Sequence, residues 1–143
     1  MQFEVTILGC SRAIPAYDRH PTSHFLNYNG HGFLIDCGEG TQMQMARHNI
    51  RRAKLDHVFI SHLHGDHFFG LMGLISSFNL NYREAPLHIY GNEGIEEIVR
   101  AHFKHAQTVL RYPIEFHVVQ PDTPAIIFEN SFLTVESIPL AHR

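Results

Sequence analysis

Three histidines and a carboxylate gather within six residues of the sequence, directly after an apolar run at 55–60. His62 and His64 alternate, and Asp66 and His67 follow at once. Imidazole nitrogens and carboxylate oxygens without a nearby cysteine suit a zinc ion, although these ligand types also bind manganese or iron. A surface loop whose histidines only bind water is the alternative. The H-x-H-x-D-H pattern at the end of a strand favours metal binding over that alternative.

The spacing of the four donors indicates two metal positions on one loop. His62 and His64 alternate on a chain that leaves a strand, so both side chains can be directed at one point. Asp66 and His67 then turn towards a second point nearby. Gly65 lies between the two pairs, where we expect its conformational freedom to allow a sharp turn.

The elements that must position this loop are predicted from local patterns. β-Branched and aromatic runs predict strands, and apolar residues at helical spacing predict helices. The predicted strands are 3–8, 23–28, 32–37, 55–61, 86–90, 114–119, 125–128 and 132–138, and the predicted helices are 41–48, 68–79 and 92–107. Asn29-Gly30 favours a tight turn, and Thr41 and Asn92 are candidate N-caps. This order predicts an α/β fold with helices packed on a mixed sheet.

Composition limits the class of protein. A chain of 143 residues with 44% hydrophobic residues is expected to form one globular domain. It has no apolar run of about 20 residues and no signal-peptide layout at its start, so we expect a cytoplasmic protein with no membrane partner. Cys10 and Cys37 are expected to be reduced and partly buried. The net charge of −3 gives no electrostatic reason for nucleic-acid binding, but bound divalent cations would add positive charge locally.

The remaining histidines are expected to be structural or solvated. The chain has 13 histidines. His88 and His117 fall within predicted strands, and His102 and His105 fall on a predicted helix. We expect no second convergent pair among them.

The sequence resembles a known family through three motifs. Ser61-His62-Leu63-His64-Gly65-Asp66-His67 resembles the signature of the metallo-β-lactamase superfamily. Within that superfamily, Ile35-Asp36-Cys37-Gly38-Glu39-Gly40-Thr41-Gln42 and Thr6-Ile7-Leu8-Gly9-Cys10 resemble motifs of the ribonuclease Z family of tRNA 3′-processing endonucleases. Pro139-Leu140-Ala141-His142-Arg143 is similar to a later family motif. The resemblance implies the αββα sandwich of the metallo-β-lactamase fold, of which this chain would cover about the first half.

The resemblance also implies a ligand set and an activity. His62, His64 and His142 would hold one zinc ion, and Asp66 and His67 would hold the other. Asp66 would also act as the proton acceptor. The implied reaction is endonucleolytic removal of 3′ trailers from precursor tRNA, in which a metal-activated water hydrolyses a phosphodiester. The implied assembly is a homodimer.

A second motif is implied to support this site. Asp36 would be a carboxylate behind the ligands, although a loop-capping aspartate fits the sequence nearly as well. The residues implied to lie close to the bound nucleic acid are Gly38, Glu39, Gly40, Thr41 and Gln42. The loop 18–23 departs from the Arg-Asn motif that many relatives carry there, so the resemblance assigns it no substrate contact.

Several family features are expected beyond Arg143. They are a bridging aspartate, a last zinc histidine and an arm that grips tRNA. We therefore expect residues 1–143 to be a single metallo-β-lactamase-type domain truncated at its C-terminal end, rather than a naturally short descendant, and to be inactive alone.

Two other functions remain open at this point. One is a different hydrolase of the superfamily that acts on a thioester, a lactone or a small phosphodiester. The other is a catalytically silent zinc-binding half-domain.

Overall fold

The structure is a computed structural model that describes residues 2–141. The strands of its main sheet are β1 (Phe3–Gly9), β2 (Ser23–Tyr28), β3 (His31–Ile35), β4 (Leu55–Phe59), β5 (Leu87–Gly91) and β6 (Ile114–Val118). The helices are α1 (Thr41–Arg47), α2 (Leu71–Leu80) and α3 (Gly94–His105). A last pair of strands, β7 (Ala125–Glu129) and β8 (Thr134–Ser137), follows. His142, a predicted zinc ligand, lies outside the described residues.

The main sheet is mixed, as predicted. Its six strands lie in sequence order from β1 to β6. The pairs β1–β2 and β2–β3 are antiparallel, and the pairs from β3 to β6 are parallel. The strand order alone predicted one mixed sheet, but β7 and β8 form a separate antiparallel pair, in keeping with the two β layers of the implied αββα sandwich. Pro121 and Pro124 lie between β6 and β7, where they cannot donate ladder hydrogen bonds because proline has no N–H.

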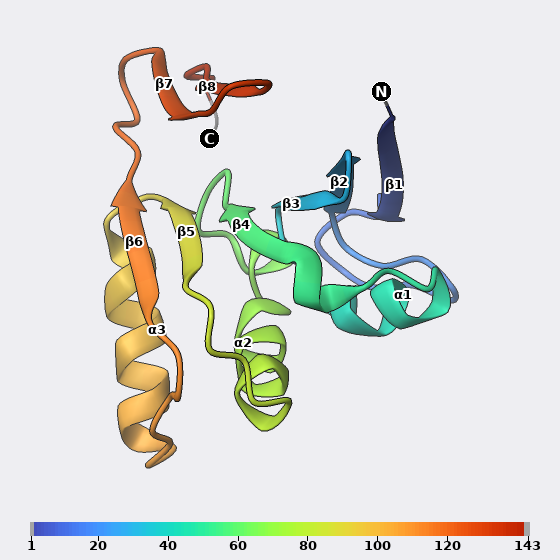
Figure 1. The fold of residues 1–143 in the computed structure, drawn as a ribbon, viewed down its shortest axis with the longest axis vertical. Helices are drawn as coiled ribbons and strands as arrows, with labels where there is room; N and C mark the ends of the chain where they lie inside the picture. Colours follow the sequence, from blue (N-terminus) through green and yellow to red (C-terminus); the bar gives the residue numbers. More distant parts are fainter. Residues whose placement is uncertain (1, 142–143) are drawn as a thin grey trace.

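The two faces of the main sheet are covered by different elements. Side chains alternate along each strand, so Val58 of β4 packs with the helices, and its neighbour Phe59 packs on the other side with the β7–β8 hairpin. Figure 1 shows the hairpin, in red, well apart from α2 and α3. The larger core, on the helix side, includes Leu34, Leu74 and Ile89, none of which is exposed. The chain therefore has an α layer, a β layer and two strands of a second β layer.

The strand order brings two loops to one edge of the sheet. β3 and β4 are parallel neighbours, so the segments that follow them emerge side by side. Asp36 follows β3, and its N–H donates to the Phe59 carbonyl oxygen at the end of β4 (2.8 Å). The predicted metal loop begins two residues later, at Ser61. Ligand sites commonly form at this carboxyl edge in parallel sheets.

Two predicted helix caps are wrong. Thr41 is the first residue of α1 rather than its N-cap, which is Gly40 in a left-handed conformation (φ +83°). The Thr41 hydroxyl instead donates to the Gly38 carbonyl oxygen (2.7 Å). Asn92 lies two residues before α3, although its side-chain oxygen still accepts a bond from the Gly94 N–H (3.2 Å). Asparagine and threonine can bond several nearby backbone groups, so sequence alone does not fix which one they use.

The two cysteines differ in their surroundings. Cys10 is exposed and Cys37 is fully buried, and both are free thiols. Burial raises the pKa of the Cys37 thiol to about 12, so it packs as a small apolar group. None of the helices within residues 2–141 has the length and apolarity that a membrane span requires.

Gly70 joins the start of α2 to the loop after β3. Its N–H donates to the Cys37 carbonyl oxygen (2.9 Å), and a Cβ at this position would collide with the Gly38 carbonyl oxygen. The three atoms nearest to this Cβ all belong to backbone, so no flexible side chain can move aside. Gly73, one turn into α2, differs because an added Cβ would meet only the end of the Gln42 side chain, at 2.9 Å.

We expect Gly70→Ala to lower the free energy of unfolding by at least about 2 kcal/mol, because the added methyl group must displace backbone. Gly73→Ala is the matched control and should change it by no more than about 1 kcal/mol, since alanine favours a helix and the Gln42 amide can rotate. Urea unfolding of both variants measures the difference. Equal losses of unfolding free energy in the two variants would show that close packing at Gly70 does not cause the destabilisation.

Candidate metal centre

The predicted metal loop contains a single 3₁₀ turn at Gly65–His67 and presents its donors in two pairs. The His62 Nε2 atom lies 3.2 Å from the His64 Nδ1 atom. The His67 Nε2 atom lies 3.4 Å from an Asp66 carboxylate oxygen. The His62 and His67 rings are adjacent, with centroids 3.8 Å apart.

These separations suit metal ligation. Two ligands that each lie about 2.0–2.1 Å from a tetrahedral zinc ion are about 3.3 Å apart. Each pair therefore has the spacing that two ligands of one ion need, and the donor types fit zinc. Within residues 2–141 the loop supplies pairs and no group of three donors, and the implied third ligand His142 lies outside this range. Metal binding by the loop stays a prediction.

Asp36 holds the loop from behind. Its side chain is buried and accepts hydrogen bonds from the Ser61 N–H (2.8 Å) and the Ser61 hydroxyl (3.0 Å). The same carboxylate also lies 2.7 Å from the His67 Nδ1 atom. A carboxylate accepts hydrogen bonds, so it favours the proton on Nδ1 and leaves the Nε2 lone pair of His67 directed at Asp66. Of the two roles considered for Asp36, this geometry favours support of a ligand.

The backbone around Asp36 is also specialised. Asp36 has a φ of +57°, in the left-handed region that aspartate tolerates better than most residues do. The next N–H, of Cys37, donates to the His67 carbonyl oxygen (2.7 Å). The loop after β3 thus binds the loop after β4 through both side chain and backbone.

The predicted nucleic-acid segment 38–42 is only partly at the surface. Glu39 is exposed and Gly40 is half-buried, whereas Gly38 and Thr41 are buried. The Gln42 side-chain oxygen accepts a bond from the hydroxyl of Ser77 in α2 (2.6 Å). Thr41 and Gln42 therefore organise the loop from inside. Contact of this segment with nucleic acid stays a prediction.

Neighbouring loop residues correct two expectations. Gly65 is not one of the glycines with positive φ. A Cβ there would collide with the Phe69 ring, so close packing explains this glycine better than a sharp turn does. The apolar residues of 68–72 are expected from the sequence to form a buried wall behind the cluster. Phe68 and Leu71 are buried, but Phe69 is 64% exposed.

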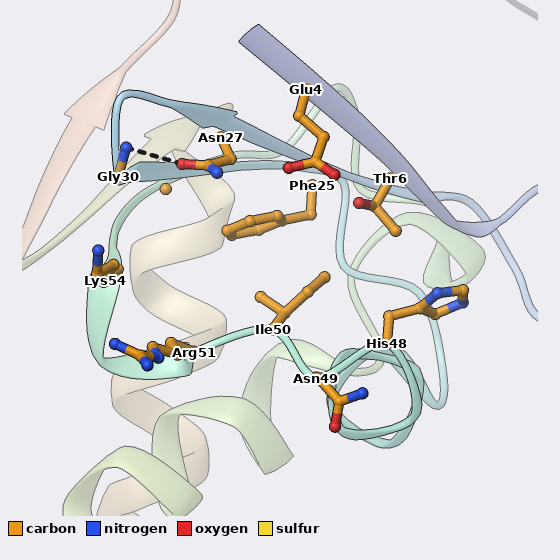
Figure 2. A pocket seen from close by; sticks show the side chains of 11 residues that line it. Glu4, Thr6, Phe25, Asn27, Gly30, His48, Asn49, Ile50, Arg51 and Lys54 are labelled. Atoms are coloured by element: carbon orange, nitrogen blue, oxygen red, sulfur yellow. Dashed lines mark hydrogen bonds between the residues drawn. The ribbon is translucent and has the colours of Figure 1, made fainter. Parts of the chain in front are cut away.

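Two pockets lie at opposite ends of β4. One, of about 250 Å³, is formed by Ser61, Tyr90 and the β7–β8 hairpin, so it opens beside the metal loop. The other, of about 280 Å³, lies between β2 and the segment that precedes β4, where Phe25 and Ile50 line it with Lys54 (Figure 2). The second pocket is at the opposite end of β4 from the loop and contains none of the predicted ligands.

A second group of metal-type donors was missed by sequence reasoning. His88, Glu115 and His117 each place one ligand atom within 4.8 Å of the other two, so the expectation of no second convergent pair is wrong. The three residues fall on neighbouring strands β5 and β6. Part of this group was visible in the sequence, since His88 and His117 lie in predicted strands. The sequence of neither strand specifies that the two strands pair.

His57 lies beside this group and is held as a neutral ring. Its ring stacks on His88 at 4.9 Å, and its Nδ1 atom lies 3.2 Å from the Tyr90 hydroxyl. Burial, reinforced by the nearby His88, lowers the pKa of His57 from 6.5 to about 4.

The layer order and the strand-end loop define a metallo-β-lactamase fold, as predicted. The metallo-beta-lactamase fold protein YhfI from Bacillus subtilis superposes with a TM-score of 0.65 at 24% identity, covering 89% of this chain and 50% of that chain. Human tRNase Z, short form, superposes with a TM-score of 0.85 at 29% identity, covering 94% of this chain and 59% of that chain.

The family can be stated more narrowly. The family model described as Anti-Pycsar protein Apyc1 matches residues 3–113, so the chain belongs to that family. A ribonuclease Z of Bacteroides fragilis is 44% identical over 142 residues, which are 99% of this chain and 47% of the relative. The predicted resemblance to ribonuclease Z is confirmed. The chain spans about half the length of the curated relatives it matches.

We expect Asp36→Asn to weaken zinc binding by the loop about 10- to 100-fold, because an amide no longer fixes the proton on the Nδ1 atom of His67. Zinc titration against a competing chelator measures this affinity. Asp122→Asn changes an exposed aspartate that does not belong to the loop and is the control. An unchanged zinc affinity in Asp36→Asn would show that Asp36 does not position the metal ligands.

We expect His57 to make the protein less stable in acid. The folded pKa lies below the unfolded value, so the folded state binds fewer protons, and stability present above pH 6.5 is lost as the pH falls towards 4. The loss should be about 1–2 kcal/mol, since the ring is only partly removed from water. Urea unfolding of the wild type and His57→Phe from pH 7 to pH 4 tests this, with His105→Phe as an exposed control. Parallel curves for all three proteins would contradict it.

Proposed function

We propose that this chain supplies the first half of a metal-dependent endoribonuclease of the ribonuclease Z type, which removes 3′ trailers from precursor tRNA. The observation that carries the proposal is the two-pair arrangement of donors in the loop after β4, held by the buried Asp36 carboxylate. The similarity to proteins named ribonuclease Z and tRNase Z supports this choice of substrate.

The donor roles follow from the pairs. His62 and His64 would hold one zinc ion, and Asp66 and His67 would hold a second. His142 joins the first pair by family resemblance alone. When bound, the two ions would lower the pKa of an attacking water and stabilise negative charge that develops on the phosphate.

The chain's own residues would orient and accept protons. Asp36 fixes the His67 ring, and the Ser61 hydroxyl reaches both Asp36 (3.0 Å) and the His62 Nδ1 atom (3.2 Å), so one hydroxyl links the two donor pairs. Asp66 would accept the proton of the attacking water, because its carboxylate is the acidic group of the loop itself. These roles need both loops in place.

Substrate contacts would lie around the exposed rim of the loop. Phe69, 64% exposed beside Gly65, offers an aromatic face on which a nucleotide base can stack. Glu39 and Gly40 lie at the surface of the adjoining loop. The bound cations would offset the formal charge of −3, which alone does not attract RNA. A homodimer stays a prediction that rests on the family resemblance, and action in the cytoplasm stays a prediction from the sequence features.

One observation favours a second candidate. The family model that matches residues 3–113 has a different name from the ribonuclease Z relatives. The same centre could therefore serve another hydrolase of the fold, acting on a small phosphodiester, a thioester or a lactone. A silent zinc-binding half-domain is the third candidate, because the described loop supplies only pairs of donors.

The test compares the 143-residue chain with a version extended by the coding sequence that follows residue 143. Metal content is measured on both, together with cleavage of a precursor tRNA bearing a 3′ trailer and of a small phosphodiester. We expect two metal ions per chain and tRNA cleavage in the extended protein alone. Cleavage of only the small phosphodiester would favour another hydrolase. Metal binding without either activity in both proteins would favour the silent module.

Within the active protein, we expect Asp66→Ala to lower kcat for tRNA cleavage by about 10²- to 10⁴-fold, because it removes the proton acceptor and a metal ligand. Asp122→Ala is the matched control at an exposed turn and should keep full activity. Retained cleavage in Asp66→Ala would exclude the proposed centre.

A further inference from the structure

We propose that His88, Glu115 and His117 form a second divalent-metal site, of the zinc type, on the sheet face opposite the helices. The three residues share no member with the loop after β4. The proposal is therefore independent of the proposed ribonuclease function, and it would stand if that function failed.

The parallel register of β5 and β6 creates the cluster. His88 pairs directly with Glu115, and Tyr90 pairs with His117 two residues further along. Residues two apart in a strand point to the same face, so all four side chains lie on one side of the sheet. Two imidazoles and a carboxylate thus meet across two strands.

The ligand atoms have suitable separations. The Nδ1 atom of His88 lies 3.0 Å from the Nε2 atom of His117 and 3.4 Å from a Glu115 carboxylate oxygen. Ligands about 2.0–2.1 Å from a tetrahedral zinc ion are about 3.3 Å apart, so small side-chain rotations suffice to enclose an ion. Two histidines and one glutamate form a common catalytic zinc set, which keeps the fourth position for water.

Stacking holds the two histidine rings in these positions. The His117 ring lies parallel to Tyr90, with centroids 4.4 Å apart at 12°. The His88 ring is flanked by His57 at 4.9 Å and by His117 at 5.3 Å. Rings already fixed by their neighbours lose little further freedom when they bind an ion.

Access also favours binding. The Glu115 side chain is 52% exposed, so an ion can enter from solvent. A bound ion would join β5 to β6, the edge strand of the main sheet. The ion would cross-link the two strands at this edge.

The alternative is a hydrogen-bonded network in which one histidine nitrogen donates to the other and no ion is bound. A zinc titration distinguishes the two, provided that the loop after β4 is first disabled. His64→Ala/His67→Ala removes one donor from each pair of that loop and serves as the background. Zinc is measured by equilibrium dialysis, and Co²⁺ is used as a probe because its visible absorption reports the ligand geometry.

We expect the background protein to bind one zinc ion per chain, with a tetrahedral Co²⁺ spectrum. Adding His117→Ala should weaken binding about 100-fold or more, and Glu115→Gln should weaken it about 10-fold. Glu115 is exposed, so the second variant tests the site even if loss of the stacked His117 ring disturbs folding. Circular dichroism checks the fold of each protein.

His102→Ala/His105→Ala is the matched control, since it removes two exposed histidines from α3. It should leave zinc binding unchanged. The proposal is overturned if the background protein binds no zinc, or if zinc binds equally well with and without His117 and the Glu115 carboxylate.

Discussion

The arrangement of the metal loop depends on one buried carboxylate. Asp36 receives the Ser61 N–H, the Ser61 hydroxyl and the His67 ring, so a single side chain positions the start and the end of the loop after β4. A buried carboxylate is costly unless its oxygens are satisfied, and these three contacts satisfy it. The backbone of the next residue, Cys37, repeats the connection through the His67 carbonyl oxygen. The positions of the predicted metal donors therefore depend on β3 as much as on β4.

The main sheet has one face that is apolar throughout and another that is apolar only in part. The helix face is a continuous apolar core in which Leu55, Val58 and Leu87 are fully buried. On the opposite face, the aromatic pair Phe59 and Tyr90 gives way along the strands to a row of histidines. Alternation of side chains allows one strand to serve both faces, because its odd and even positions meet different surroundings. This division allows His88, Glu115 and His117, the ligands of the proposed second site, to lie on one face of the sheet without disturbing the core on the other.

How much was predictable depends on how local each feature is. The strands and helices were found close to their observed bounds, and Asn29-Gly30 formed its turn with Asn29 and Gly30 both at positive φ. The strand order alone did not predict the separate β7–β8 pair, since nothing within those strands specifies which strands they pair with, although the αββα sandwich implied by the resemblance contains two β layers. The role of Gly65 was misread because the Phe69 ring that excludes a side chain there comes from packing. Local chemistry is visible in a sequence, but contacts between distant segments are not.

The predicted chemistry of the strand-end loop can be inferred from local sequence alone. His62, His64, Asp66 and His67 lie so close in the chain that any strand end would bring them together, and their types alone indicate a metal. The contacts of these residues with distant segments depend on the tertiary structure. Asp36 reaches His67 only because β3 and β4 are parallel neighbours, and His88 meets His117 only because β5 and β6 pair in one register. The physical reason is that strand pairing is a non-local choice, made by burying apolar side chains across the whole sheet.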